Sequence, residues 1–169
     1  MTGFTFGQPF GHGLTEQSTV TPGRAGASDP PAAGQPYTLK LERYDRWRLV
    51  AVTFDLATDG NAADRYVQVQ YLDGTGTPIV RDIAAVAQAA TKTVHYSGAK
   101  DGLIAQDALT NVTASFRLSG LWLEAGQSVK IDIGAVQVGD QLLNIRMTFD
   151  RSLVPGDGTQ DLYDARLEG

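Results

Sequence analysis

Residues Arg46 to Asp73 read RWRLVAVTFDLATDGNAADRYVQVQYLD, and this stretch decides the fold. Two runs rich in β-branched and aromatic residues, Trp47 to Leu56 and Arg65 to Leu72, flank a polar link that contains glycine. Such runs, bounded by polar and Gly-containing residues, predict a pair of sheet-forming strands.

The two runs distribute their apolar residues differently. In the second run, Val67, Val69 and Tyr71 fall on one face and glutamines fall on the other, which predicts a half-buried strand. In the first run, apolar residues fall on both faces. We therefore expect this strand to lie centrally and to be covered on each side.

Shorter runs with the same two-residue period surround this pair. We expect further strands at residues 37–42, 79–82, 91–96, 112–118, 128–133 and 143–149. In the last of them, Leu143, Ile145, Met147 and Phe149 are expected to share the buried face. About eight short strands without a long helix predict an all-β chain that folds as an antiparallel β-sandwich. Because a jelly roll has eight strands, it is the expected form of this sandwich.

Two segments leave alternatives open. Ile83 to Ala90 reads IAAVAQAA, which fits one or two helical turns or a strand of small residues. Ser97 to Thr110 is a loop long enough to serve a function or an interface.

Both ends of the chain differ in composition from the middle. Residues 1–35 are rich in Gly, Pro, Ser and Thr and show no helix or strand period, which predicts an extended N-terminal arm. Residues 36–154 form the predicted sandwich domain, and the polar, acidic residues 155–169 form a C-terminal tail. Because such an arm cannot bury enough of itself to offset its ordering entropy, we expect contacts with other chains to hold it, with packing on its own domain as the alternative.

A few apolar side chains stand out in these terminal segments. Large apolar residues in a segment with few other apolar residues need to be covered, so they are the candidate contacts with a partner protein or another subunit. In the arm they are Phe4, Phe6, Phe10 and Leu14. In the tail the candidate anchors are Leu162, Tyr163 and Leu167.

The charge and the cysteine content exclude several classes of protein. The 169 residues carry a formal net charge of −5, the wrong sign for a protein that binds nucleic acid by neutralising phosphates. The chain has no cysteine, so disulfides and thiolate metal sites are excluded. No stretch is apolar enough for a signal peptide or a membrane span, so we expect synthesis in a cytoplasm and no contact with a membrane.

The sequence holds no catalytic signature. The two histidines, His12 and His95, are too few for a cupin-type metal site, and no nucleophile elbow, phosphate loop or dinucleotide motif occurs. The carboxylate pairs Asp101 with Asp107 and Asp55 with Asp59 are interpreted as solvated charges. We therefore expect no enzyme activity, no cofactor and no metal.

Two further clusters have a structural and a functional interpretation. Asp73 and Thr75 in the stretch DGTGTP offer oxygen atoms to calcium, but a plain hairpin turn is favoured. Aromatic and guanidinium groups gather at Tyr44, Arg46, Trp47, Arg48 and Tyr66, where they can stack on a sugar or a partner. The favoured interpretation places Trp47 in the core and pairs the arginines with neighbouring acids.

Several of these motifs together carry a family resemblance. They are Trp47-Arg48, Leu56 to Asp59, Arg65 to Val69, Asp73 to Gly76, Leu123 to Gly126 and Gly139 to Gln141. In these motifs the chain, from Tyr37 to Phe149, resembles small β-sandwich proteins encoded near the capsid genes of tailed bacteriophages.

The resemblance implies a virion structural protein without catalytic residues. Its expected role is that of a head decoration (cement) protein, made in the bacterial cytoplasm and bound to the outer capsid surface. The implied partners are the major capsid protein and further copies of the chain, with a trimer favoured; a minor head or fibre-base role is also implied. The rival hypothesis is a carbohydrate-binding or receptor-binding β-sandwich module of a phage tail or fibre, which needs an exposed aromatic platform.

Overall fold

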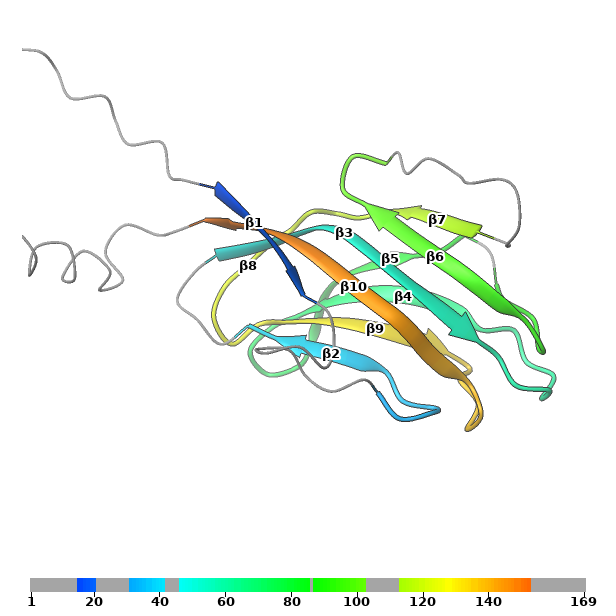
Figure 1. Cartoon of the computed structure of the whole chain (residues 1–169). Coiled ribbons are helices and arrows are strands. Elements are labelled where there is room, and N and C mark those ends of the chain that lie inside the picture. The colour runs from blue at the N-terminus through cyan, green and yellow to red at the C-terminus, as the bar shows by residue number, and fades with distance from the viewer. Residues whose placement is uncertain (1–14, 21–30, 42–45, 86, 103–112, 153–169) are drawn as a thin grey trace, which may run out of the picture.

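A computed structural model describes residues 15–20, 31–41, 46–85, 87–102 and 113–152, of which 15–20 and 113 are described by their backbone alone. Within these ranges the chain forms strands and no helix (Figure 1), which confirms the all-β prediction. The strands are β1 (Thr15–Val20), β2 (Tyr37–Lys40), β3 (Arg46–Ala57), β4 (Tyr66–Leu72), β5 (Pro78–Ile83), β6 (Thr93–Ala99), β7 (Thr113–Arg117), β8 (Trp122–Leu123), β9 (Ser128–Gly134) and β10 (Gln141–Ser152). No helix in the described ranges is therefore long and apolar enough to cross a membrane.

The strands form two sheets that lie as two layers (Figure 1). The larger sheet has the order β1-β10-β3-β6-β7, with β8 paired to β3, and the smaller sheet has the order β2-β9-β4-β5. The two runs of the central stretch thus lie in opposite sheets, because the link between β3 and β4 crosses from one layer to the other. The predicted β-sandwich is confirmed.

Strand β3 has the central position expected for it, between β10 and β6. Its inward side chains Val52, Phe54 and Leu56 are fully buried. On the other face, Ala51 and Thr53 are half-buried. The expectation that both faces are covered is therefore wrong for the outer face, where small and polar residues meet solvent.

The core lies between the sheets and is built from alternating residues of both. Phe54 of β3 stacks on Tyr96 of β6, with ring centroids 5.3 Å apart and ring planes 10° apart. From the smaller sheet, Val69 and Ile131 are fully buried and belong to the same cluster. The period of two predicted for these strands is the direct cause of this arrangement.

One strand pair departs from the antiparallel pattern. Strand β7 runs parallel to β6, with Tyr96 opposite Ala114 and Gly98 opposite Phe116. A Cβ atom on Gly98 would lie 2.8 Å from the Phe116 ring, so the absence of a side chain lets this ring cross the strand. The larger sheet is therefore mixed.

Strand β10 contains a bulge that the sequence pattern does not reveal. Its pairing with β3 shifts register between Leu143 and Arg146, and Asn144 has a φ of 51°. Because the bulge adds a residue, Leu142 and Ile145 are buried, whereas Leu143 is 37% exposed. The prediction that Leu143 faces the core is wrong for this reason.

The segment after β5 is neither of the two elements considered for it. Described residues between Ile83 and Ala90 form no helix and no strand, apart from an isolated bridge between Arg65 and Gln88. The Gln88 amide donates to the backbone oxygens of Leu56, at 2.8 Å, and Lys92, at 2.9 Å. These hydrogen bonds hold the segment where it crosses between the sheets.

Residues 1–35 include a strand, which the composition did not predict. Strand β1 pairs with β10, so that Thr15 lies opposite Ser152 and Val20 opposite Met147. This part of the predicted arm therefore packs on its own domain. The candidate contacts Phe4, Phe6, Phe10 and Leu14 and the tail anchors Leu162, Tyr163 and Leu167 lie outside the described residues.

A buried arginine ties together the loops at one end of the sandwich. Nε and Nη2 of Arg65 each donate to a carboxylate oxygen of Asp140 at 2.9 Å, and Nη2 also donates to Asp59 at 2.6 Å. Nη1 donates to the backbone oxygens of Asn61, at 2.8 Å, and Ala63, at 2.7 Å. The link between β3 and β4 is thereby fastened to the turn that precedes β10.

This network makes stability depend on pH through Asp140. Burial acts to raise the pKa of Asp140, but hydrogen bonds from Arg65 and from the N–H groups of Gln137 and Asp59 outweigh it and leave this pKa below its ordinary value. A carboxyl with a lowered folded pKa contributes its full stability above the unfolded pKa, about 3.9, and loses it as the pH falls through the folded pKa.

We therefore expect the free energy of unfolding to decrease as the pH falls below about 4. Urea titrations across the acidic range would measure this decrease. Asp140→Asn is expected to be less stable at neutral pH and to show a shallower acid dependence. Equal acid slopes for the two proteins would show that Asp140 is not responsible.

Candidate functional site

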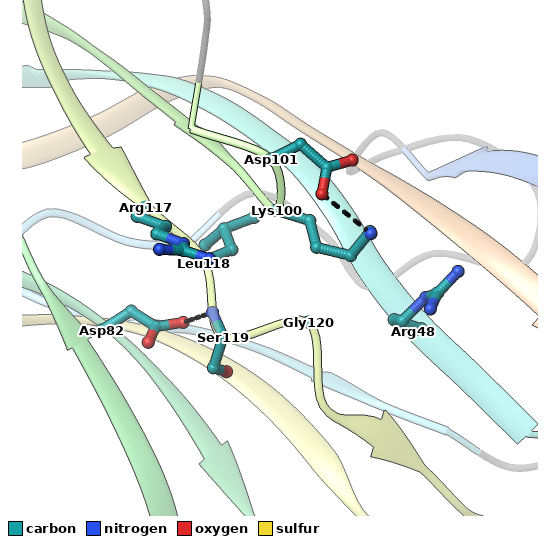
Figure 2. Close-up of a pocket in the computed structure, with 8 residues that line it drawn as sticks. All are labelled: Arg48, Asp82, Lys100, Asp101, Arg117, Leu118, Ser119 and Gly120. Atoms are coloured by element: carbon teal, nitrogen blue, oxygen red, sulfur yellow. Dashed lines mark hydrogen bonds and ion pairs between the residues drawn. The ribbon is translucent and has the colours of Figure 1, made fainter.

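A hollow of about 470 Å³ opens on the surface where the two sheets meet near β5 and β7 (Figure 2). It is built from four segments that are distant in the sequence. Its lining residues are Arg48 of β3, Asp82 of β5, Lys100 and Asp101 after β6, and Arg117, Leu118, Ser119 and Gly120 at the end of β7 and beyond.

Local geometry places the link after β7 at the base of this hollow. The Ser119 N–H donates to the Asp82 carboxylate at 2.8 Å, which fastens the link to β5. Gly120 has a φ of 63°, and a Cβ atom there would lie 2.6 Å from Cγ of Lys100. Glycine therefore permits both the turn and the position of Lys100 over the backbone.

Three cationic groups surround the hollow. Arg48 donates to Asp150 at 2.6 Å, and Nζ of Lys100 lies 3.0 Å from a carboxylate oxygen of Asp101. Arg117 is exposed and forms no ion pair with any residue that the structure describes. Because Asp82 and Asp101 also line the hollow, the cations exceed the acids by one, and Arg117 is the cation that can meet an anionic group.

Polar atoms without partners lie around the hollow. Tyr71 is fully buried, and its hydroxyl group has no hydrogen-bond partner within the described part of the chain. Burial raises the pKa of Tyr71, with Asp82, Ser119 and Gly120 as its polar neighbours. Nε of Arg48 is likewise buried without a partner among the described atoms.

A tryptophan lies beside the same arginine. The guanidinium carbon of Arg48 lies 4.6 Å from the ring centroid of Trp122, and that of Arg46 lies 5.9 Å from it. With the ion pair to Asp150, this contact fixes the orientation of the Arg48 side chain.

The predicted aromatic and guanidinium cluster does not form as one site. Trp47 is half-buried against the core, where its ring meets Phe149 edge-on at 5.8 Å. Arg48 pairs with Asp150, in agreement with the structural interpretation. Tyr66 follows the far end of β3 and so lies at the other end of the sandwich, and Tyr44 lies outside the described residues.

The remaining candidates are engaged in structural contacts. His95 Nδ1 lies 2.6 Å from Asp55, whose other oxygen accepts from the Asn144 amide at 2.6 Å. Asp59 pairs with Arg65, while His12 and Asp107 lie outside the described residues. Among the described residues, no group of three or more His, Asp or Glu side chains is placed to hold a metal ion.

The stretch DGTGTP forms the predicted hairpin turn, between β4 and β5. One Asp73 carboxylate oxygen accepts the N–H groups of Thr75 and Thr77, each at 2.8 Å. Hydrogen bonds, first of all from the Thr75 side chain, hold the pKa of Asp73 below its usual range. The carboxylate therefore serves the turn itself.

Sequence reasoning missed the hollow. Lys100 stood in a predicted loop, and Arg117 stood on the polar face of a predicted strand. No local pattern indicates that they meet Arg48 across the sheet. The one local signal is Gly120, a glycine directly after a strand.

No protein-family model matches this chain, and no curated protein matches it. Among solved structures, the chain is similar to one described as the structure of infectious bursal disease virus Gt strain, with 11% sequence identity and a TM-score of 0.31. The similarity covers 87% of this chain and 32% of that chain, so this chain spans about a third of the length of that protein.

Proposed function

We propose that this chain is a non-enzymatic structural protein of a tailed-phage virion, which decorates the outer capsid surface and stabilises the shell. The observation that carries the proposal is the strand order. Four strands of the larger sheet follow the order β1-β10-β3-β6, and the smaller sheet follows β2-β9-β4-β5. This order supports the predicted jelly roll, an architecture used by viral capsid domains and lectins.

The path of the chain between the two sheets gives a rigid domain, which is suited to binding a shell of repeated subunits. The chain changes sheets between β1 and β2, β2 and β3, and β3 and β4, so strands distant in the sequence become neighbours. Because the chain passes repeatedly between the two sheets, neither sheet can form or move without the other. A stiff body can bind a shell through modest contacts that symmetry repeats many times.

The smaller sheet offers a surface for such contacts. On its edge strand β5, Ile79 is 48% exposed and Ile83 is 58% exposed, and Tyr66 on β4 is 52% exposed. Ile83 lies opposite Gln68, two residues from Tyr66. Exposed apolar side chains of this kind support binding to the major capsid protein or to further copies in a homo-oligomer, with a trimer favoured.

The rings of the two tryptophans favour this proposal over the carbohydrate-binding one. Arg48 lies over the half-buried Trp122, and the guanidinium carbon of Arg151 lies 5.6 Å from the ring centroid of Trp47. In the described ranges, Tyr66 is the one large aromatic residue that is mostly exposed. A sugar platform built from several open aromatic faces therefore has no support in this part of the chain.

The test is co-sedimentation of the full chain with empty shells of its major capsid protein. Because β1 belongs to the larger sheet, deletion of residues 1–35 would also remove a strand. We therefore use the triple variant Phe4→Ala, Phe6→Ala, Phe10→Ala. The unaltered chain is expected to bind saturably, and the triple variant is expected to lose most of this binding because it lacks the apolar anchors.

A matched control replaces polar arm residues, as Thr2→Ala, Thr5→Ala, Gln8→Ala, and is expected to bind normally. Undiminished binding of the phenylalanine variant would refute the role of the arm. If the unaltered chain fails to bind shells but binds a glycan surface, the decoration proposal is wrong and the rival holds.

A further inference from the structure

We propose that the hollow lined by Arg48, Lys100 and Arg117 is a docking site for carboxylate groups, and that its occupant is the acidic C-terminal segment 153–169 of this chain. This inference concerns contacts between parts of the same protein, in one copy or between copies. It does not depend on the proposed role in a virion.

The first argument is that cationic groups converge with hydrogen-bond donors to spare. Figure 2 shows the Lys100 amine joined to Asp101 and pointing to the side of the hollow where Arg48 lies. Arg48 is held in place by Asp150 and Trp122. A guanidinium group that is already oriented loses little entropy when it receives a second carboxylate.

The second argument is that the lining of the hollow holds three cations and two acids, Asp82 and Asp101, and that Arg48 and Lys100 already have acidic partners whereas Arg117 has none among the described residues. Asp82 accepts the Ser119 N–H, and the Asp101 side chain is 86% exposed at the rim. Arg117 has no acidic partner in the described part of the chain.

The third argument is where the acidic segment leaves the sheet. In the register of β10 with β3, Asp150 lies opposite Arg48, and Ser152, the last residue of β10, lies opposite Arg46. The chain therefore departs beside the hollow.

The segment that follows has the complementary charge and sufficient length. Residues 153–169 carry four acids and one arginine, namely Asp157, Asp161, Asp164, Glu168 and Arg166. Fully extended, this segment reaches roughly 55 Å, enough to enter the hollow of its own copy or of a neighbour. Opposite charges at a partly exposed site attract each other over about 10 Å at moderate ionic strength.

Carbodiimide coupling tests the proposal on the full chain, because this reagent joins a carboxylate to an amine that it contacts. The chain has four lysines, Lys40, Lys92, Lys100 and Lys130, of which Lys100 lines the hollow. We expect the main cross-link of the segment, mapped by mass spectrometry, to join Lys100 to one of the four acids of the segment.

The yield of this cross-link is expected to fall several-fold when sodium chloride is raised from about 0.05 M to about 0.5 M. A mixture of ¹⁴N- and ¹⁵N-labelled chains shows whether the two groups belong to one copy or two.

Two variants distinguish docking of the segment in the hollow from random coupling of its acids to surface lysines. Arg117→Ala keeps the reactive amine of Lys100 and is expected to reduce the cross-link several-fold, whereas Lys40→Met, on the other sheet, is expected to leave it unchanged. The product between Lys100 and Asp101, whose charged groups lie 3.0 Å apart, shows that Lys100 is reactive. Presence of that product without a cross-link to the segment overturns the proposal. So does coupling of the segment to exposed Lys40 or Lys92 as often as to Lys100.

Discussion

Replacing Arg65 by methionine is expected to lower the free energy of unfolding by about 3–5 kcal/mol, the usual cost of leaving one half of a buried ion pair. Arg65 and Asp140 are both fully buried at their charged ends, so the variant leaves the Asp140 carboxylate without its cation. The backbone oxygens of Asn61 and Ala63 also lose their donors. Urea unfolding at neutral pH, followed by tryptophan fluorescence, measures the loss.

Three variants control this prediction. Arg65→Lys is expected to recover little, because one ammonium group cannot reproduce the forked contacts with Asp140 and Asp59. Arg81→Met removes an exposed arginine from β5 and is expected to change stability by no more than about 0.5 kcal/mol. The double variant Arg65→Met, Asp140→Leu is expected to regain part of the loss, because no unpaired charge stays buried. If Arg65→Met costs no more than Arg81→Met, the network does not hold the loops.

Replacing Phe54 by alanine is expected to cost about 3–5 kcal/mol, the range measured for buried aromatic residues. Phe54 is fully buried at the middle of β3, and its ring stacks on Tyr96 of the neighbouring strand. The variant loses this stacking and leaves a cavity between the two sheets, which β3 and β6 cannot close without moving. Denaturant unfolding of the purified chain gives the difference.

Ile79→Ala is the matched control for Phe54→Ala. It also shortens a large apolar side chain on a strand, but Ile79 is 48% exposed on the edge strand β5. We expect a change within about 0.5 kcal/mol. A loss for Phe54→Ala that is equally small would mean that the core between the sheets contributes little to stability.

The buried faces of several strands could be predicted from their own residues. In β9, Val129, Ile131 and Ile133 alternate with polar residues and are buried as the pattern indicated. The same pattern failed in β10, where Asn144 takes a positive φ and the bulge turns Leu143 outwards. A bulge adds one residue without a marker in the two-residue period, so alternation alone does not locate it.

The alternation of apolar residues could not predict the contacts that join the loops at one end of the sandwich or the residues that line the hollow. Arg65 was assigned to the start of a strand, and its partner Asp140 stands 75 residues away along the chain. Lys100 and Arg117 meet Arg48 because β6 and β3 are neighbours in the larger sheet and β7 lies beside β6. These are pairings between strands, which the composition of each strand leaves open.

By itself, the sequence determined the all-β class, the inward faces of most strands and the acidic charge of the chain. Each of these follows from local chemistry, because successive side chains of an extended backbone point to opposite faces and apolar ones avoid water. The tertiary structure alone decided that β3 and β4 lie in opposite sheets, that β7 runs parallel to β6 and that three cationic residues surround one hollow. The physical reason is that strand neighbours are selected by the packing of the two whole layers, in which every strand satisfies its hydrogen bonds and buries its apolar face at once.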